Sequence, residues 1–551
     1  MINNREGLES WLKKKENVAL LAVMLLALVL SLYYSSVTSN QPLWWDESDY
    51  LAYSKTVAGI GSGDWIVTTK HNTLFVYAVA GMFLFGFSES LIRFLLEILP
   101  FLLVVFLSYK IVMEMYKDYR LATIASFLLA TSWVFLFNAM RFHVDVPSLL
   151  FGLLAIYFFW RGYENKEKVF GIDSKWAVPL AALFVIICYG VRRGYFLFGI
   201  FLLVYVLMMK NPKEFIKDKF NWIAFGLSVV LIWIMEKFVF SSPLSQVSTG
   251  YVHTESPLNL IVLHVFQDYF SNIQMPLASI LLYLFWIGFV FMVAGLVLSF
   301  GFIKKQENFK RRADLFFLIT IIVTMSFFFF ILRVQTSAGE PRWFFPMILG
   351  CFVAIGRAIL PISEYLKKYG KQISVIFIVL ILGFGGYYEI SHADFIIKNK
   401  VGTFEGIKDA GLYLKNVANE SDLIIVAPQP QASYYSERRV IHPSKLAGWN
   451  ESGATTPFDL FLSSLEKTPE AKYLIVTFSE PNHPEWMQKI TYAQSNGQTV
   501  MAKWEIPFME TSVDFTTGAQ DIKPGIQYSN GIGFKLLTIK EDAFVYEITR
   551  D

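Results

Sequence analysis

Two adjacent carboxylates follow the first long apolar run, in the segment Leu43-Trp44-Trp45-Asp46-Glu47-Ser48-Asp49-Tyr50. The run before them, 18–37, is nearly free of polar side chains and is long enough to cross a bilayer, which takes about 20 residues. Carboxylates at a lipid boundary are costly and mark functional sites more often than chance. Such a group could act as a general base towards a nucleophile. Asp46 and Glu47 are therefore candidate catalytic residues.

Further polar residues stand in the short links between later apolar runs. Asp145 is a third candidate catalytic or acceptor-binding acid, although Arg141, four residues earlier, could pair with it on a helix end. Guanidinium and ammonium groups suit a phosphate, but long basic side chains at a span end also reach lipid headgroups without any catalytic role. The candidate phosphate ligands are Lys70, Arg192, Arg193 and Arg342. The candidate contacts to a sugar or acceptor are Trp45, His71, Arg141 and His143.

The composition is that of a polytopic membrane protein. Only 17% of the 551 residues are charged and 54% are hydrophobic, whereas soluble domains carry about 25% charged residues. The formal net charge is only +3 and no nucleic-acid-binding motif is present, so a nucleic-acid partner is not expected. The two cysteines, Cys188 and Cys351, form neither a disulfide framework nor a zinc-type cluster.

About eleven apolar runs are predicted to cross the membrane. They are 18–37, 91–113, 121–139, 146–163, 176–191, 195–209, 221–240, 277–300, 313–332, 343–360 and 373–391. Lysine and arginine recur in alternate links between them, which indicates a cytoplasmic N-terminus. This orientation brings Asp46, Asp145 and Arg342 to the external face of what we expect to be a plasma membrane.

Two long external loops are predicted, 38–90 and 241–276. In the first, the apolar run Leu74–Phe87 is too short to span and is expected to form an interfacial or re-entrant helix. The second is expected to hold another helix on the membrane surface.

The chain changes character after residue 391. Residues 1–391 are predicted to form the transmembrane domain, and 392–551 a soluble extracytoplasmic domain. Helical spacing alternates there with short apolar strands, which predicts an α/β fold with a partly parallel sheet. The expected elements are helix 403–419, strand 422–427, helix 457–465 and strand 473–478.

The order of these features resembles the class C glycosyltransferases, specifically the protein O-mannosyltransferase and aminoarabinose transferase type. Asp46-Glu47 stands where that family has its acidic pair, and Phe85–Arg93 matches its Phe-Gly-x-Ser-Glu-x-x-x-Arg segment. Arg141–Asp145 matches the second external loop, and Arg342–Pro346 is similar to Arg-Tyr-x-x-Pro. Lys70–Leu74 corresponds to His/Lys-Pro-Pro-Leu with the prolines replaced, which leaves the shape of this loop and any metal role open.

The resemblance implies a class C fold and an inverting enzyme. It would move one hexose or pentose from a polyprenyl- or dolichyl-phosphate carrier to a protein, glycolipid or lipid-linked glycan at the external face, with mannosyl transfer in protein or cell-envelope glycosylation as an example. Asp46 would act as the base or would orient the acceptor, and the basic residues would hold the departing phosphate. No cofactor is firmly indicated, and a divalent cation is the one candidate.

Two other classes remain open. A lipid-carrier flippase or transporter would be expected to have inverted repeats and charged residues near the span centres. A non-catalytic membrane subunit of a glycan-assembly complex would keep the acidic motif for structure alone.

Overall fold

The computed structural model describes residues 11–60, 73–210, 212–240, 286–302, 308–327, 341–448, 457–478, 483–495 and 498–551. The chain forms two compact units that interleave in sequence. Unit 1 comprises Met1–Ser39, Asn72–Phe75 and Glu89–Asn399; unit 2 comprises Asn40–His71, Val76–Ser88 and Lys400–Asp551. The predicted domain boundary after residue 391 falls inside one helix, α21 (Lys371–Lys400). The helix predicted within 241–276 lies outside the described residues.

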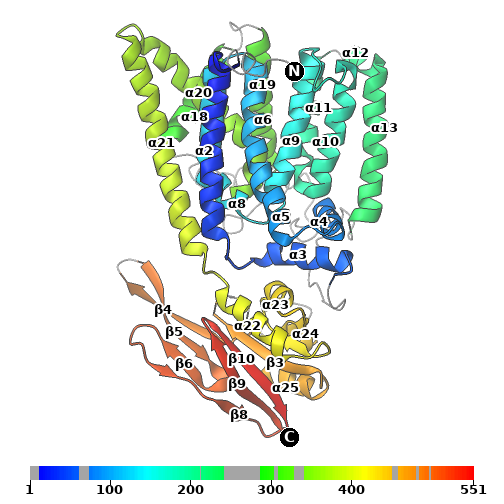
Figure 1. The fold of residues 1–551 in the computed structure, drawn as a ribbon, viewed down its shortest axis with the longest axis vertical. Helices are drawn as coiled ribbons and strands as arrows, with labels where there is room; N and C mark the ends of the chain where they lie inside the picture. Colours follow the sequence, from blue (N-terminus) through cyan, green and yellow to red (C-terminus); the bar gives the residue numbers. More distant parts are fainter. Residues whose placement is uncertain are drawn as a thin grey trace, which may run out of the picture. The chain divides into compact units, whose positions relative to one another are not determined.

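Unit 1 is a bundle of helices that run side by side (Figure 1). Its longer helices are α2 (Lys15–Thr38), α6 (Leu99–Tyr116), α7 (Tyr119–Thr131), α9 (Asp145–Phe158), α10 (Ala177–Val191), α11 (Leu197–Met209), α13 (Lys219–Ile234), α18 (Trp286–Phe302), α19 (Asn308–Ser326), α20 (Phe345–Leu366) and α21. Short helices extend or connect them, among them α5 (Glu89–Arg93), α8 (Trp133–Ala139), η4 (Arg193–Phe196), η5 (Met235–Val239) and η8 (Pro341–Phe344).

Each predicted span overlaps a helix within the described residues, but not every helix has the length and composition of a span. Seven of the described helices do, or eight if the bent pair α7–α8 counts as one span. Two others, Arg193–Met209 and Ile287–Ser299, are apolar but shorter, and α19 begins with the charged stretch Lys310-Arg311-Arg312. A multi-pass membrane protein is thus confirmed, whereas the predicted number of eleven spans is not.

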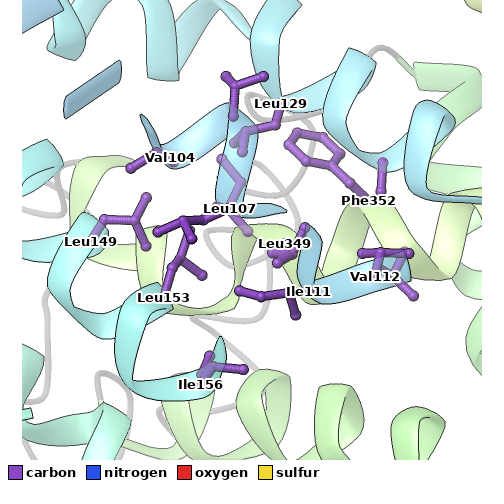
Figure 2. Packing of buried hydrophobic residues seen from close by; sticks show 14 of the residues in the cluster. Val104, Leu107, Ile111, Val112, Leu129, Leu149, Leu153, Ile156, Leu349 and Phe352 are labelled. Carbon is purple, nitrogen blue, oxygen red and sulfur yellow. The ribbon is translucent and has the colours of Figure 1, made fainter. Parts of the chain in front are cut away.

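The core of unit 1 forms where helix α6 meets α7, α9 and α20. Its buried residues recur at helical spacing, as in Leu149, Leu153 and Ile156 of α9, so one face of each helix turns inwards. Figure 2 shows Leu149 and Leu153 of α9 beside Leu107 of α6, with Ile156 farther along α9. This packing holds the helix ends that carry the polar residues described below.

The predicted span 121–139 is broken rather than continuous. Helices α7 and α8 meet at 58°, and Ser132 between them has an extended ψ of 124°. A break leaves the N–H groups of the next helix without their usual acceptors. The buried carboxylate of Glu389, on α21, accepts the N–H of Trp133 at 2.9 Å and so replaces an acceptor that the bend removes.

Unit 2 contains the tail of the chain as a helix-covered sheet (Figure 1). Its helices are α22 (Glu405–Val417), α23 (Gln429–Ser436), α24 (Pro443–Leu446) and α25 (Phe458–Glu466). Its strands are β1 (Leu423–Ile425), β2 (Arg439–Ile441), β3 (Ala471–Thr477), β4 (Lys489–Ser495), β5 (Gln498–Ile506), β6 (Thr511–Asp514), β7 (Gln520–Asp521), β8 (Gly525–Gln527), β9 (Ile532–Lys540) and β10 (Ala543–Arg550).

The strands form two sheets, in the orders β2-β1-β3-β10-β9-β8 and β4-β5-β6-β7. Strand β1 is parallel to β2 and β3, and β10 is antiparallel to β3, so the predicted partly parallel α/β sheet is confirmed. Alternate residues face opposite layers. Along β3, Tyr473 and Ile475 pack with α22, whereas Leu474 and Val476 join a second core that includes α25 and Trp504 of β5.

Histidine 483 makes this tail sensitive to acid. Burial lowers the pKa of His483 to about 3, and the nearby His442 contributes. Because the folded pKa lies below the ordinary value near 6.5, the stabilisation is complete above pH 6.5 and is lost as the pH falls towards 3, by about 1.4 kcal/mol per pH unit. We expect the protection of β3 amides against hydrogen exchange to fall over this range. The His483→Gln variant should show a shallower decline, and equal slopes in both proteins would contradict the assignment.

Candidate functional site

The acidic pair lies in the first turn of helix α3 (Trp45–Val57), in unit 2. Glu47 is 3% exposed, and its carboxylate accepts the backbone N–H of Trp44 at 3.1 Å, which caps the start of the helix. Asp46 is half-buried and keeps part of its surface open to solvent, as does Trp45. The two carboxylates are therefore not equivalent: Glu47 stabilises the helix end, and Asp46 is the more accessible.

A second polar group forms in unit 1 around Asp145, the first residue of α9. Asp145 is fully buried, and its Oδ1 is bonded by the guanidinium of Arg192. The hydroxyl of Tyr195 lies 3.2 Å from the same oxygen and 3.2 Å from the carbonyl oxygen of Arg342. Arg342 Nη1 lies 3.6 Å from Oδ2 of Asp145. One buried carboxylate thus faces two guanidinium groups.

His143 completes this cluster. Its Nδ1 lies 2.5 Å from Oδ2 of Asp145, and Arg342 is hydrogen-bonded to the ring on its Nε2 side. A guanidinium only donates, so the ring nitrogen that Arg342 bonds must be an acceptor. The chain from Asp145 through His143 therefore orients Arg342. The side chains of Arg192 and Arg342 remain 20% and 14% exposed, so each can still meet a ligand.

The other predicted basic residues of unit 1 have different surroundings. Arg193 lies 3.4 Å from the carboxylate of Glu236 and stacks on the ring of Phe240 at 3.8 Å. Arg141 lies over the ring of Phe137, 5.4 Å from its centroid. Arg192 and Arg193 separate because Arg192 has extended backbone angles between α10 and η4. Arg192 therefore joins the Asp145 cluster and Arg193 joins Glu236.

Lys70 and His71 lie outside the described residues, so their predicted roles stay predictions. Within the described part of the chain, no three histidine, cysteine, aspartate or glutamate side chains come together in a way that could hold a metal ion. The described residues therefore do not fit a metal centre, and no step below is assigned to one.

Two residues of these clusters were missed by the sequence analysis. Nothing in the sequence marks Tyr195 as a site residue, because tyrosine is common in this chain and its partner Asp145 lies 50 positions away. Glu236 could have been found from the sequence, because an acidic residue inside the apolar run 221–240 is costly unless it is paired. Its pairing with Arg193 and with the hydroxyl of Tyr189 explains its presence.

Asp145→Asn should destabilise unit 1. Removing one partner of a buried ion pair costs about 3–5 kcal/mol, and the partial exposure of both arginines reduces that cost here. We expect a lower Tm in detergent and partial recovery when Arg192→Gln is added, because the second change removes the uncompensated charge. Asp173→Asn, at an exposed aspartate beside Lys175, is the control and should leave Tm unchanged. An unchanged Tm in Asp145→Asn would contradict the role of this carboxylate.

Comparison with known proteins identifies the fold of this chain. No family model matches the sequence, and no curated protein matches it. The oligosaccharyltransferase of Archaeoglobus fulgidus tethered to an acceptor peptide is similar in structure, with a TM-score of 0.60 and 14% identity over 90% of this chain and 74% of that chain. AglB from the same organism, bound to an inhibitory peptide and a dolichol-phosphate, has a TM-score of 0.56 at 14% identity, covering 89% of this chain and 74% of that one. This chain has the fold of the class C glycosyltransferases.

The predicted class C fold is thereby confirmed. ArnT from Cupriavidus metallidurans in the apo state is also matched, with a TM-score of 0.49 and 14% identity over 96% of this chain and 97% of that one. At 14% identity the class C likeness concerns the fold, and the chemistry has to be argued from the residues of this chain.

Proposed function

We propose that this class C chain is an inverting glycosyltransferase that takes a single sugar from a polyprenyl- or dolichyl-phosphate carrier. The observation that carries the proposal is the Asp145 cluster, in which Arg192 and Arg342 surround one fully buried carboxylate. Both guanidinium groups are partly exposed, and guanidinium groups recognise phosphate in a bidentate way. The archaeal oligosaccharyltransferase with the same fold has been solved with a dolichol-phosphate, which supports a lipid-linked donor.

In the proposed reaction, a nucleophilic atom of the acceptor attacks the anomeric carbon from the side opposite the phosphate. The bond from carbon to the acceptor forms while the bond from carbon to the phosphate oxygen breaks, and the electron pair leaves with the phosphate. Asp46 takes the proton of the acceptor. Arg192 and Arg342 stabilise the departing anion, since fixed cations aimed at developing charge lower the barrier. The anomeric configuration inverts because there is a single displacement.

The remaining sites receive supporting roles. Glu47 caps helix α3 and holds Asp46 in its first turn, while Asp145 and His143 orient the arginines. Arg193, Arg141 and Trp45 stay candidates for contacts to the donor or acceptor, as do Lys70 and His71. The acceptor is a protein, glycolipid or lipid-linked glycan; an oligosaccharyltransferase of this fold holds an acceptor peptide, which favours a protein. We further propose an external active site, a cytoplasmic N-terminus and an extracytoplasmic tail.

The function is tested with the full-length protein in liposomes. The probes are short-chain polyprenyl-phosphate hexoses and pentoses, and the products are polyprenyl phosphate and glycosylated acceptor, both measured by mass spectrometry. We expect turnover of at least one donor and its loss in Arg342→Gln. Movement of an intact fluorescent polyprenyl-phosphate lipid across the membrane, without any cleavage, would favour the flippase. Absence of both activities, with glycan changes in cells that lack the protein, would favour the non-catalytic subunit.

A further inference from the structure

Helix α3 belongs to the same compact unit as the tail of the chain. Residues Asn40–His71 group with Lys400–Asp551, although more than 300 residues of unit 1 separate them in sequence. The acidic pair is therefore carried by a helix whose described neighbours include α23 of the tail. This grouping raises the question of what the tail contributes to the position of Asp46.

The start of α3 is tied to the tail at three points. The hydroxyl of Tyr435, on α23, accepts the backbone N–H of Leu43 at 2.8 Å. The ammonium of Lys408, on α22, donates to the carbonyl oxygen of Asn40 at 3.0 Å. The ring of Phe404 meets that of Trp44 edge-on, with centroids 6.2 Å apart. All three contacts fall on the few residues just before Asp46.

The far end of α3 is tied to the same short helix. Lys55, in the last turn of α3, donates to the hydroxyl of Tyr434 at 3.3 Å. Its ammonium also lies 4.5 Å from the centroid of that ring, within the range of a cation–π interaction. Tyr434 and Tyr435 are neighbours on α23 and hold opposite ends of the 13-residue helix α3. Two contacts at separated points fix the direction of a helix as well as its place.

We propose that Tyr435 and Tyr434 are positioning residues for the reaction, which act by fixing helix α3 and through it Asp46. The inference rests on the proposed function of Asp46 and gives the tail domain a part in catalysis. Its physical basis is that a reacting group displaced by about 1 Å can cost about 10²-fold in rate, although the hydrogen bond that holds it contributes little to stability.

The test compares two tyrosines of the tail. Tyr435→Phe removes only the hydroxyl that binds Leu43. Tyr528→Phe is the matched control, because the hydroxyl of Tyr528 donates to the carbonyl oxygen of Phe508 in the core on the other side of the six-stranded sheet. We expect kcat to fall about 10-fold in Tyr435→Phe with the donor KM unchanged, and to stay at the wild-type value in Tyr528→Phe. Equal kcat losses in both variants would overturn the proposal.

A double variant separates positioning from general stability. If Tyr435 acts through Asp46, adding Tyr435→Phe to Asp46→Asn should cost nothing further, because the group to be positioned is gone. The same 10-fold loss in both backgrounds would overturn the proposal. Faster hydrogen exchange at residues 43–47 in Tyr435→Phe is expected as well, and unchanged exchange there would contradict it. Failure of the proposed function itself would look different, since the wild-type protein would then show no sugar transfer, and failure of the role of Asp46 would appear as full transfer in Asp46→Asn.

Discussion

Replacing Asp46 with asparagine should lower the rate of sugar transfer by about 10²–10⁴-fold, the usual contribution of a general base. Asparagine has nearly the same shape but cannot take the proton of the acceptor. The effect should appear in kcat, with the donor KM little changed, because the phosphate is bound by other residues. The measurement is initial rate in liposomes at saturating donor, with Tm recorded for each variant.

Glu47→Gln is the comparison on the same helix turn. The carbonyl oxygen of glutamine can still accept the N–H of Trp44, so the cap is preserved while the charge is lost. We expect a loss of less than about 10-fold. If Glu47→Gln were as inactive as Asp46→Asn, Glu47 would share the chemistry. If Asp46→Asn retained wild-type activity, Asp46 would not be the general base.

Arg342→Gln should reduce kcat by about 10²–10³-fold, the cost of removing one preorganised group that stabilises developing charge. Because the same cation should hold the product, inhibition by added polyprenyl phosphate should weaken as well. Arg342→Lys is expected to recover only part of the loss, since an ammonium keeps the charge but not the forked geometry that pairs with phosphate and with His143.

The matched control is Arg357→Gln. Arg357 lies on α20, the helix that follows η8 with its Arg342, and it also pairs with a buried aspartate, Asp314, at 3.0 Å. It should therefore reproduce the damage to stability that comes from breaking a buried pair, without a selective loss of product binding. Wild-type affinity for polyprenyl phosphate in Arg342→Gln would rule out contact with the leaving group.

The helices and strands predicted correctly from the sequence are those whose apolar residues follow one another without interruption. Long apolar runs became helices, and Ile424 and Ile475 lie in strands that are buried on both faces and so read as unbroken apolar segments. Strands β2 and β4 to β10 were not predicted. Most of them combine buried and exposed residues, as β5 does with Trp504 buried and Val500 39% exposed. The bend at Ser132 depends on a carboxylate 257 positions later and has no local signal.

The sequence indicated most residues of the Asp145 cluster but did not indicate which of them pair. Charge asymmetry along the chain placed Asp145, Arg192 and Arg342 among a larger set of polar residues on one face, and the structure brings these three together. The local alternative, a pair between Asp145 and Arg141, was equally consistent with the spacing. Only packing between distant helices assigns Arg192 and Arg342 to Asp145, because their separations of 47 and 197 positions carry no periodic signal.

The hydrogen bond between Leu43 and Tyr435 joins residues 392 positions apart. Ribosomes add about 5–20 residues per second, so Tyr435 follows Leu43 after roughly 20–80 seconds of synthesis. During that interval the tail is not yet synthesised, so the segment that leads into helix α3 lacks its contacts with α22 and α23. A chain interrupted before residue 435 would therefore lack this hydrogen bond and, under the proposed function, a fixed position for Asp46.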